Sequence, residues 1–143
     1  MKQYVNRNQA EKLKALGYHE PCNWYYVIES KEGEDIPDGK LKSPVMEFDY
    51  NKNRRTVSCP DVDDVCNWFV ENYSIFIFVR RTLDEYKRYF QVFIQDKNGK
   101  NTNALKSNEN PEHSKTTFKL LHKAKLTGID KAIEWVTEIN NQI

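Results

Sequence analysis

The sequence has no long hydrophobic run and few of the glycines that build common catalytic loops. No apolar stretch among its 143 residues approaches the roughly 20 that a membrane-spanning helix needs. The N-terminal residues lack the apolar core of a secretory signal peptide. None of the 5 glycines belongs to a phosphate-binding loop, a dinucleotide fingerprint or a nucleophile elbow. The sequence therefore predicts a cytoplasmic protein without a membrane partner, and it carries no signature of a known catalytic class.

Cysteine and net charge are also scarce. The 3 cysteines are an odd number, which favours free thiols in a reducing compartment over a disulfide framework. The formal net charge is +1, so the net charge of the chain gives no indication of a strongly charged partner. Charge is nevertheless uneven, because residues 29–49 are mainly acidic and residues 113–126 carry four lysines and no acid. These stretches are either two solvated faces or two docking patches.

Most of the apolar residues lie between Pro60 and Lys100. A helix is predicted from Asp61 to Asn72, because apolar residues recur at spacings of three and four behind a capping aspartate. The apolar run Ile75–Val79 predicts a strand buried on both faces. A turn is expected over residues 80–85, and a second strand from Tyr86 to Gln95, with a further bend at Asn98-Gly99.

The remaining chain predicts one helix at each end and several short strands. Residues 115–126 fit either a strand or a helix, and the strand is preferred because a helix is expected to begin at Thr127. Loops are expected near residues 30–44 and 97–114. The predicted fold is a single α+β domain over residues 1–143, with a mostly antiparallel sheet and helices packed on one face. The other predicted elements are a helix over 6–16, strands over 24–29 and 45–50, and an extended segment over 54–58.

The order of these motifs resembles that of a group of short proteins. The motifs are Leu13-Lys-Ala-Leu-Gly-Tyr-His-Glu-Pro-Cys22, an acidic loop, a Pro60 helix bearing Cys66-Asn67-Trp68-Phe69, an aromatic hairpin, and Ala132-Ile133-Glu134 in a closing helix. Together they resemble short uncharacterised proteins of Bacteroides-type gut bacteria and of their phages or mobile elements. The resemblance implies a bacterial, mobile-element setting. It implies no activity and no catalytic residue.

The clearest candidate binding face is the segment RRTLDEYKRYF, residues 80–90, which mixes basic and aromatic residues. Basic side chains bind phosphate and exposed aromatic rings stack on unpaired bases, so weak binding of single-stranded nucleic acid is one hypothesis. Aromatic and arginine side chains are also typical of protein interfaces, which makes a protein partner or a homo-oligomer the other. The residues assigned to this face are Arg80, Arg81, Tyr86, Arg88 and Tyr89.

Catalytic chemistry has little support. His19, Glu20 and Cys22 are close in sequence, and a Cys–His pair can serve as nucleophile and base or as two metal ligands. No second such pair follows, and Cys66 falls on the apolar stripe of its helix. The sequence therefore predicts no catalytic residue, no metal and no cofactor. The favoured function is a non-enzymatic accessory or protein-interaction module. Nucleic-acid binding is the first alternative, and a thiol-dependent or metal-dependent enzyme is the second.

Overall fold

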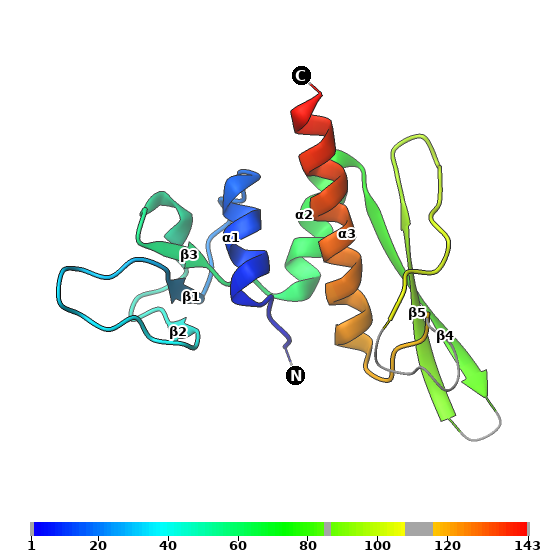
Figure 1. Cartoon of the computed structure of the whole chain (residues 1–143), viewed down its shortest axis with the longest axis horizontal. Coiled ribbons are helices and arrows are strands. Elements are labelled where there is room, and N and C mark those ends of the chain that lie inside the picture. Colours follow the sequence, from blue (N-terminus) through cyan, green and yellow to red (C-terminus); the bar gives the residue numbers. More distant parts are fainter. Residues whose placement is uncertain (1, 85–86, 108–115, 143) are drawn as a thin grey trace. The chain divides into compact units, whose positions relative to one another are not determined.

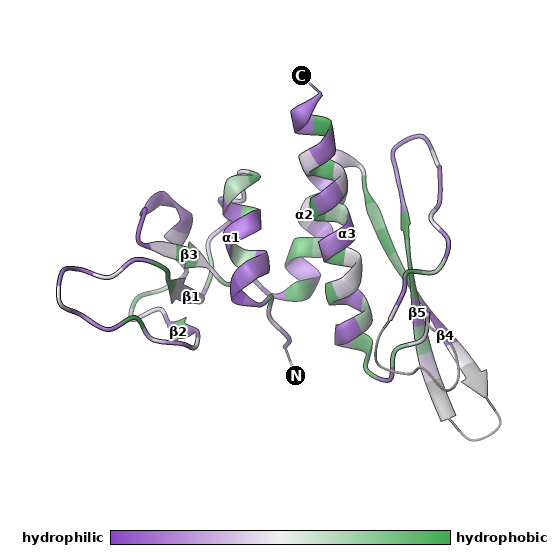
Figure 2. Ribbon diagram, viewed as in Figure 1, coloured by the Kyte–Doolittle hydropathy of each residue, from purple (hydrophilic) through white to green (hydrophobic). Residues whose placement is uncertain are grey.

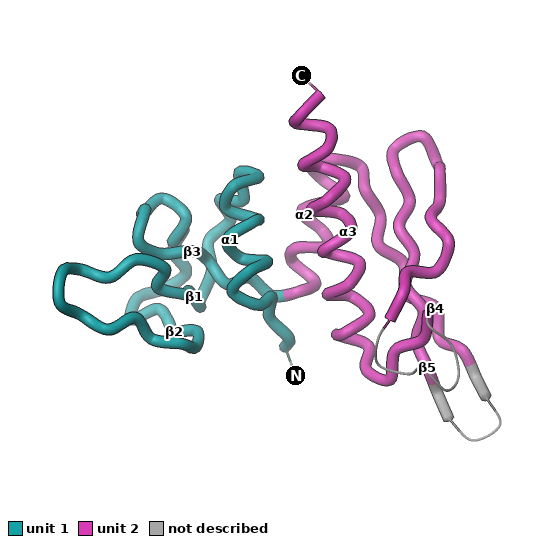
Figure 3. The backbone as a smooth tube through the Cα atoms, in the orientation of Figure 1, with its two compact units in different colours: residues 1–61 teal, residues 62–143 magenta. Residues whose placement is uncertain are grey.

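The structure is a computed structural model that describes residues 2–84, 87–107 and 116–142. Its helices and antiparallel strands confirm the α+β class (Figure 1). The strands form two sheets, one of three strands and one of two, where a single sheet was expected. The chain divides into two compact units, residues 1–61 and residues 62–143, and each is described by itself (Figure 3).

The first unit combines one helix with a small sheet. Helix α1 spans Arg7–Ala15, and a capping box starts it: Gln9 N donates to Asn6 Oδ1 (2.8 Å) and Asn6 N to Gln9 Oε1 (3.1 Å). The sheet has the order β2-β1-β3 and is antiparallel throughout. Its strands are β1 (Trp24–Val27), β2 (Leu41–Lys42) and β3 (Thr56–Ser58), and a 3₁₀ turn, η1, covers Tyr50–Lys52.

Helix α1 packs on β3 and closes the core of this unit. Ala10 and Leu13 are buried on the inner side of the helix, and Val57 is fully buried in β3. The Lys14 ammonium donates to the carbonyls of Asn53 (2.6 Å) and Thr56 (3.0 Å), which ties the helix to the chain around β3. Gly17 follows the helix with φ +93°, a conformation that favours glycine after the end of a helix.

The second unit is a two-stranded sheet covered by helices. Helix α2 (Val62–Tyr73) leads into strand β4 (Phe76–Asp84), which pairs with β5 (Lys87–Gln95). Helix α3 (Leu121–Asn141) packs on both strands and on α2. Apolar residues recur along α3 between polar ones (Figure 2), and its buried positions include Ala124, Ile129 and Val136. Helices α2 and α3 therefore pack next to each other and against this sheet.

Three predictions about local structure are wrong. Residues 121–126 are helical, because α3 begins at Leu121 and buries Ala124, while Lys123 remains exposed. Residues 45–50 form no strand, and Val45 and Met46 are 64% and 89% exposed. β4 continues to Asp84, where a turn was expected from Arg80 onward.

The loop predictions hold in part. Residues 30–40 carry no helix or strand and are mainly exposed, but Leu41–Lys42 form β2. Gly99 takes φ +81° in a tight turn after β5, which confirms the bend at Asn98-Gly99. The expected loop 97–114 is described only as far as residue 107, so the remainder of that prediction lies outside the described residues.

Candidate interaction surface

The register of β4 against β5 sorts their side chains onto two faces. Ile77 pairs with Ile94 and Val79 with Val92, while Phe78 pairs with Phe93 and Arg80 with Gln91. Residues that are directly opposite in an antiparallel pair project to the same side, and neighbours along a strand project to opposite sides. The inner face therefore carries the aliphatic pairs. The outer face, as the term is used below, consists of Phe76, Phe78, Arg80, Gln91 and Phe93.

The inner face is filled by helix α3. A β-carbon added at Gly128 would lie 2.5 Å from Ile77 Cγ2, closer than real carbon contacts allow, and 3.0 Å from Val92 Cγ2, which is tighter than most. The helix backbone thus rests directly on the sheet at this position, and Val92 and Ile94 are fully buried. The inner face has no area left for a partner at this point.

The outer face leaves aromatic rings in water. Phe76 and Phe78 are 38% and 44% exposed, and their rings are nearly parallel, 11° apart, at a centroid distance of 6.2 Å. Arg80 Nη2 donates to Gln91 Oε1 (2.6 Å), and the Arg80 guanidinium carbon lies 5.5 Å from the Phe93 ring centroid. This cation–π contact and the hydrogen bond hold Arg80 flat against the sheet. The prediction that this strand is buried on both faces is wrong.

Strand β4 also has an open edge. The far side of β5 is already occupied, since Thr102 N donates to Ile94 O (2.8 Å), Leu105 N to Val92 O (2.9 Å), and Phe90 and Phe118 exchange two backbone bonds of 2.8 Å. Within the described ranges, β4 makes strand pairing with β5 alone. Its other side presents backbone donors and acceptors that a further strand could pair with.

The five residues predicted as one binding face do not form one. Arg80 and Arg81 are both exposed but are neighbours in β4, so they project to opposite faces. Tyr89 is only 4% exposed. Tyr86 lies outside the described residues, and Arg88 is described only through its backbone, which pairs with Leu83. Sequence reasoning missed Phe76 and Phe78, because their run was read as fully buried.

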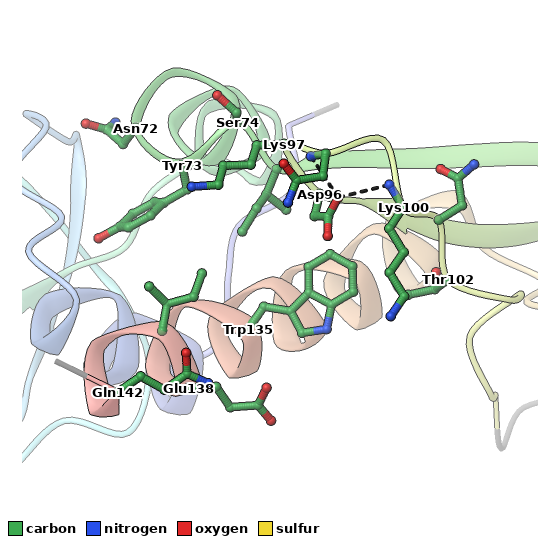
Figure 4. Close-up of a pocket in the computed structure, with 14 residues that line it drawn as sticks. Asn72, Tyr73, Ser74, Asp96, Lys97, Lys100, Thr102, Trp135, Glu138 and Gln142 are labelled. Atoms are coloured by element: carbon green, nitrogen blue, oxygen red, sulfur yellow. Dashed lines mark hydrogen bonds between the residues drawn. The ribbon is translucent and has the colours of Figure 1, made fainter.

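An open groove of about 800 Å³ lies beside this sheet, at the end of β5 (Figure 4). The C-terminal turns of α2 and α3 and the turn after β5 line it, and Trp135 faces Asp96 and Lys100 from α3. Asp96 Oδ1 accepts from the amides of Asn98 and Lys100, each at 2.9 Å, so this carboxylate is engaged in closing the turn. Lysines and acids both line the groove, which gives it no single sign of charge.

The residues considered for thiol or metal chemistry lie in the first unit. His19 Nδ1 is 3.0 Å from Asp49 Oδ2, and the Cys22 thiol donates to Glu20 O at 3.4 Å. Burial raises the pKa of the Cys59 thiol to about 11, which keeps it protonated and a poor nucleophile near neutral pH. Over the residues that were searched, namely those the structure describes, no group of three or more His, Cys, Asp or Glu is placed to hold a metal ion.

Comparisons of the chain with protein-family models, with curated proteins and with solved structures find no match in any of the three. None of the helices in the described part of the chain is both long enough and apolar enough to cross a membrane. A function for the outer face must therefore be argued from its own residues.

Proposed function

We propose that this chain is a non-enzymatic accessory protein that acts by binding another protein through the outer face and open edge of β4. The observation that supports this most is the pair of exposed phenylalanines, Phe76 and Phe78, on the face of the sheet opposite α3. The exposed parts of these rings leave apolar area in water that a partner would cover, and a strand edge beside them supplies backbone hydrogen bonds.

The composition of the outer face fits a protein partner. Aromatic residues and arginine are enriched at the centres of protein interfaces, where they carry most of the binding energy. Arg80 lies on this face and contacts Gln91 and Phe93. The proposed setting is the bacterial cytoplasm, as the resemblance to mobile-element proteins and the sequence composition suggest.

Site-specific photo-crosslinking tests the proposal. A benzophenone amino acid placed at position 78 should form a defined adduct with a protein in bacterial cells. Position 48 is the matched control, because Phe48 is 45% exposed against 44% for Phe78 but belongs to the first unit. The adduct at position 78 should disappear when Arg80→Glu is added. No adduct at position 78, or the same adducts from both positions, would contradict the proposal.

Binding of single-stranded nucleic acid remains the second candidate. The nearly parallel rings of Phe76 and Phe78 are suited to stacking on bases, which favours it. Against it, Arg80 is the one basic side chain on the described part of the outer face, and it donates to Gln91.

A fluorescence titration with labelled single-stranded and duplex oligonucleotides, at low and high salt, separates the two candidates. We expect no binding in the micromolar range, because counterion release from several phosphates requires several cations along the surface. Binding that weakens steeply with salt and is lost in Arg80→Ala would instead favour nucleic acid. Lys123→Ala, at an exposed position on α3, is the control substitution.

A further inference from the structure

We propose that the partner of β4 is a second copy of the same chain, which pairs antiparallel with the open edge about a two-fold axis at Val79. The inference rests on the proposed function and names its partner. The two sheets would join into one of four strands in the order β5-β4-β4-β5. Each copy would contribute the same surface, as closed two-fold interfaces require.

The two-fold axis limits the register. An axis perpendicular to the sheet keeps both outer faces on one side and makes one residue face its own counterpart. Arg80 is the middle residue of β4, and Arg81 beside it is unsuited to this position because two Arg81 side chains would face each other, which leaves Phe78, Val79 and Arg80. The three registers differ in what they place opposite Arg80.

The register centred on Val79 pairs every residue from Phe76 to Thr82, sets no two arginines opposite each other, and leaves Ile77 opposite Arg81 of the second copy on the inner side. It places Phe78 opposite Arg80 of the second copy, twice per dimer, and Phe76 opposite Thr82 of the second copy. Arginine opposite an aromatic ring is an attractive cross-strand pair, and for this pair Arg80 would exchange its contacts with Gln91 and Phe93 of β5. A centre at Arg80 would set two guanidinium groups directly opposite each other, which is destabilising. A centre at Phe78 would pair only residues 76–80 of the two β4 strands, two fewer than the register centred on Val79.

The dimer would cover both unpartnered features of β4, its open edge and its exposed phenylalanine rings. The open edge acquires backbone partners, which is the usual way in which a long apolar edge strand is protected when no helix or loop covers it. The exposed rings of Phe76 and Phe78 would lie beside the polar ends of the second β4 instead of in water. The side chains of the register, from Phe76 to Thr82, all belong to the described residues.

Charge substitutions at position 78 test the register. Phe78→Glu and Phe78→Lys remove the same ring, but the first places a carboxylate and the second an ammonium opposite Arg80 of the second copy. We expect the dimer dissociation constant of Phe78→Lys to exceed that of Phe78→Glu by about tenfold or more. Sedimentation equilibrium over the micromolar range measures both constants, and circular dichroism confirms that both variants fold.

Disulfide trapping gives an independent readout. In a Cys66→Ser background, Val79→Cys should form a linked dimer on mild oxidation, because residue 79 faces itself across the axis at a distance suited to a disulfide. Thr82→Cys is the matched control, since residue 82 would face position 76 and should remain unlinked. Dimers that link equally at both positions, or that do not distinguish Phe78→Glu from Phe78→Lys, would overturn the register.

The photo-crosslink at position 78 separates failure of this inference from failure of the proposed function. A dimer that forms in the predicted register, together with an adduct of twice the chain mass, supports both. A wild-type chain that is monomeric at high micromolar concentration overturns the second copy as partner. If position 78 then still captures a different protein, the interaction function stands without dimerisation. A monomer that captures nothing at position 78 overturns both.

Discussion

At the scale of single residues, Cys59 and Tyr26 share one acceptor in the first unit. The Tyr26 hydroxyl donates to Val5 O at 3.0 Å, and the Cys59 thiol donates to the same oxygen at 3.4 Å. Burial, followed by the hydrogen bond with Cys59, raises the pKa of Tyr26 far above its usual value. Burial also raises the pKa of Cys59, from 9.0 to about 11. The fold therefore favours the neutral form of both groups.

The raised pKa of Cys59 predicts a loss of stability in alkali. The folded pKa lies above the unfolded value, so the stabilising contribution is complete below pH 9.0 and is lost as the pH rises to about 11. A shift of this size corresponds to roughly 2–3 kcal/mol of unfolding free energy. Urea denaturation of the wild type and of Cys59→Ala, on both sides of this interval, measures it.

Cys59→Ala should lose less stability over the same pH interval, because it has no thiol to ionise. Tyr26 titrates in both proteins, and because Cys59 is one cause of its raised pKa, the substitution reduces the contribution of Tyr26 in the same direction. Equal losses in the two proteins would show that the Cys59 thiol is not held neutral by the fold.

At the scale of elements, the approach of α3 to the β4–β5 sheet is set by Gly128. Glycine costs a helix interior about 1 kcal/mol relative to alanine. Here it allows the helix backbone to rest on Ile77 and Val92, which a β-carbon would prevent. The packing requirement outweighs the helix propensity, and it explains a glycine in the middle of a buried helix face.

Gly128→Ala should therefore destabilise the second unit in spite of its higher helix propensity. Overpacking a core costs about 1–3 kcal/mol, which exceeds the gain of about 1 kcal/mol in propensity. Urea denaturation measures the change in unfolding free energy. In an Ile77→Ala background the nearest methyl is absent, so Gly128→Ala should cost less there or become stabilising. The same cost in both backgrounds would contradict a direct contact.

The elements also show how far local patterns were informative. The second strand of the hairpin was predicted over 86–95 from a partial alternation of its side chains, and β5 confirms it over Lys87–Gln95, while Tyr86 lies outside the described residues. Residues 115–126 were misjudged, because lysines at positions 119, 123 and 125 fit both alternation and a helical row. In the structure these residues from Leu121 onward belong to α3, which begins six residues earlier than predicted and buries Ala124.

At the scale of the whole molecule, each unit builds a core from its own residues. Leu13, Tyr18 and Val57 are fully buried in the first unit, and Phe69, Ile94 and Val136 are buried in the second. The predicted single sheet would have required one core shared by all strands. The strands instead form two sheets, one in each unit, and each unit has fully buried residues of its own. Local unfolding can therefore be confined to one unit.

Hydrogen exchange tests this separation. Val57→Ala and Val136→Ala each remove two methyl groups from a fully buried site, at a cost of about 1–3 kcal/mol. We expect Val57→Ala to accelerate amide exchange mainly in residues 2–61 and Val136→Ala mainly in residues 62–142. The exposed substitution Lys123→Ala should leave both profiles unchanged. Uniform acceleration along the chain by either valine substitution would show that the two units unfold together.

The sequence by itself determined the features that depend on near neighbours in the chain. These are the capping box at Asn6, the glycine turns at Gly17 and Gly99, the apolar stripe of α2 and the alternation of β5. Only the tertiary structure decided which faces are covered. Phe78 and Tyr89 are both aromatic residues of strands, yet one is 44% exposed and the other is 4% exposed. Burial depends on segments that are distant in sequence, and a local pattern of side chains carries no record of where those segments pack.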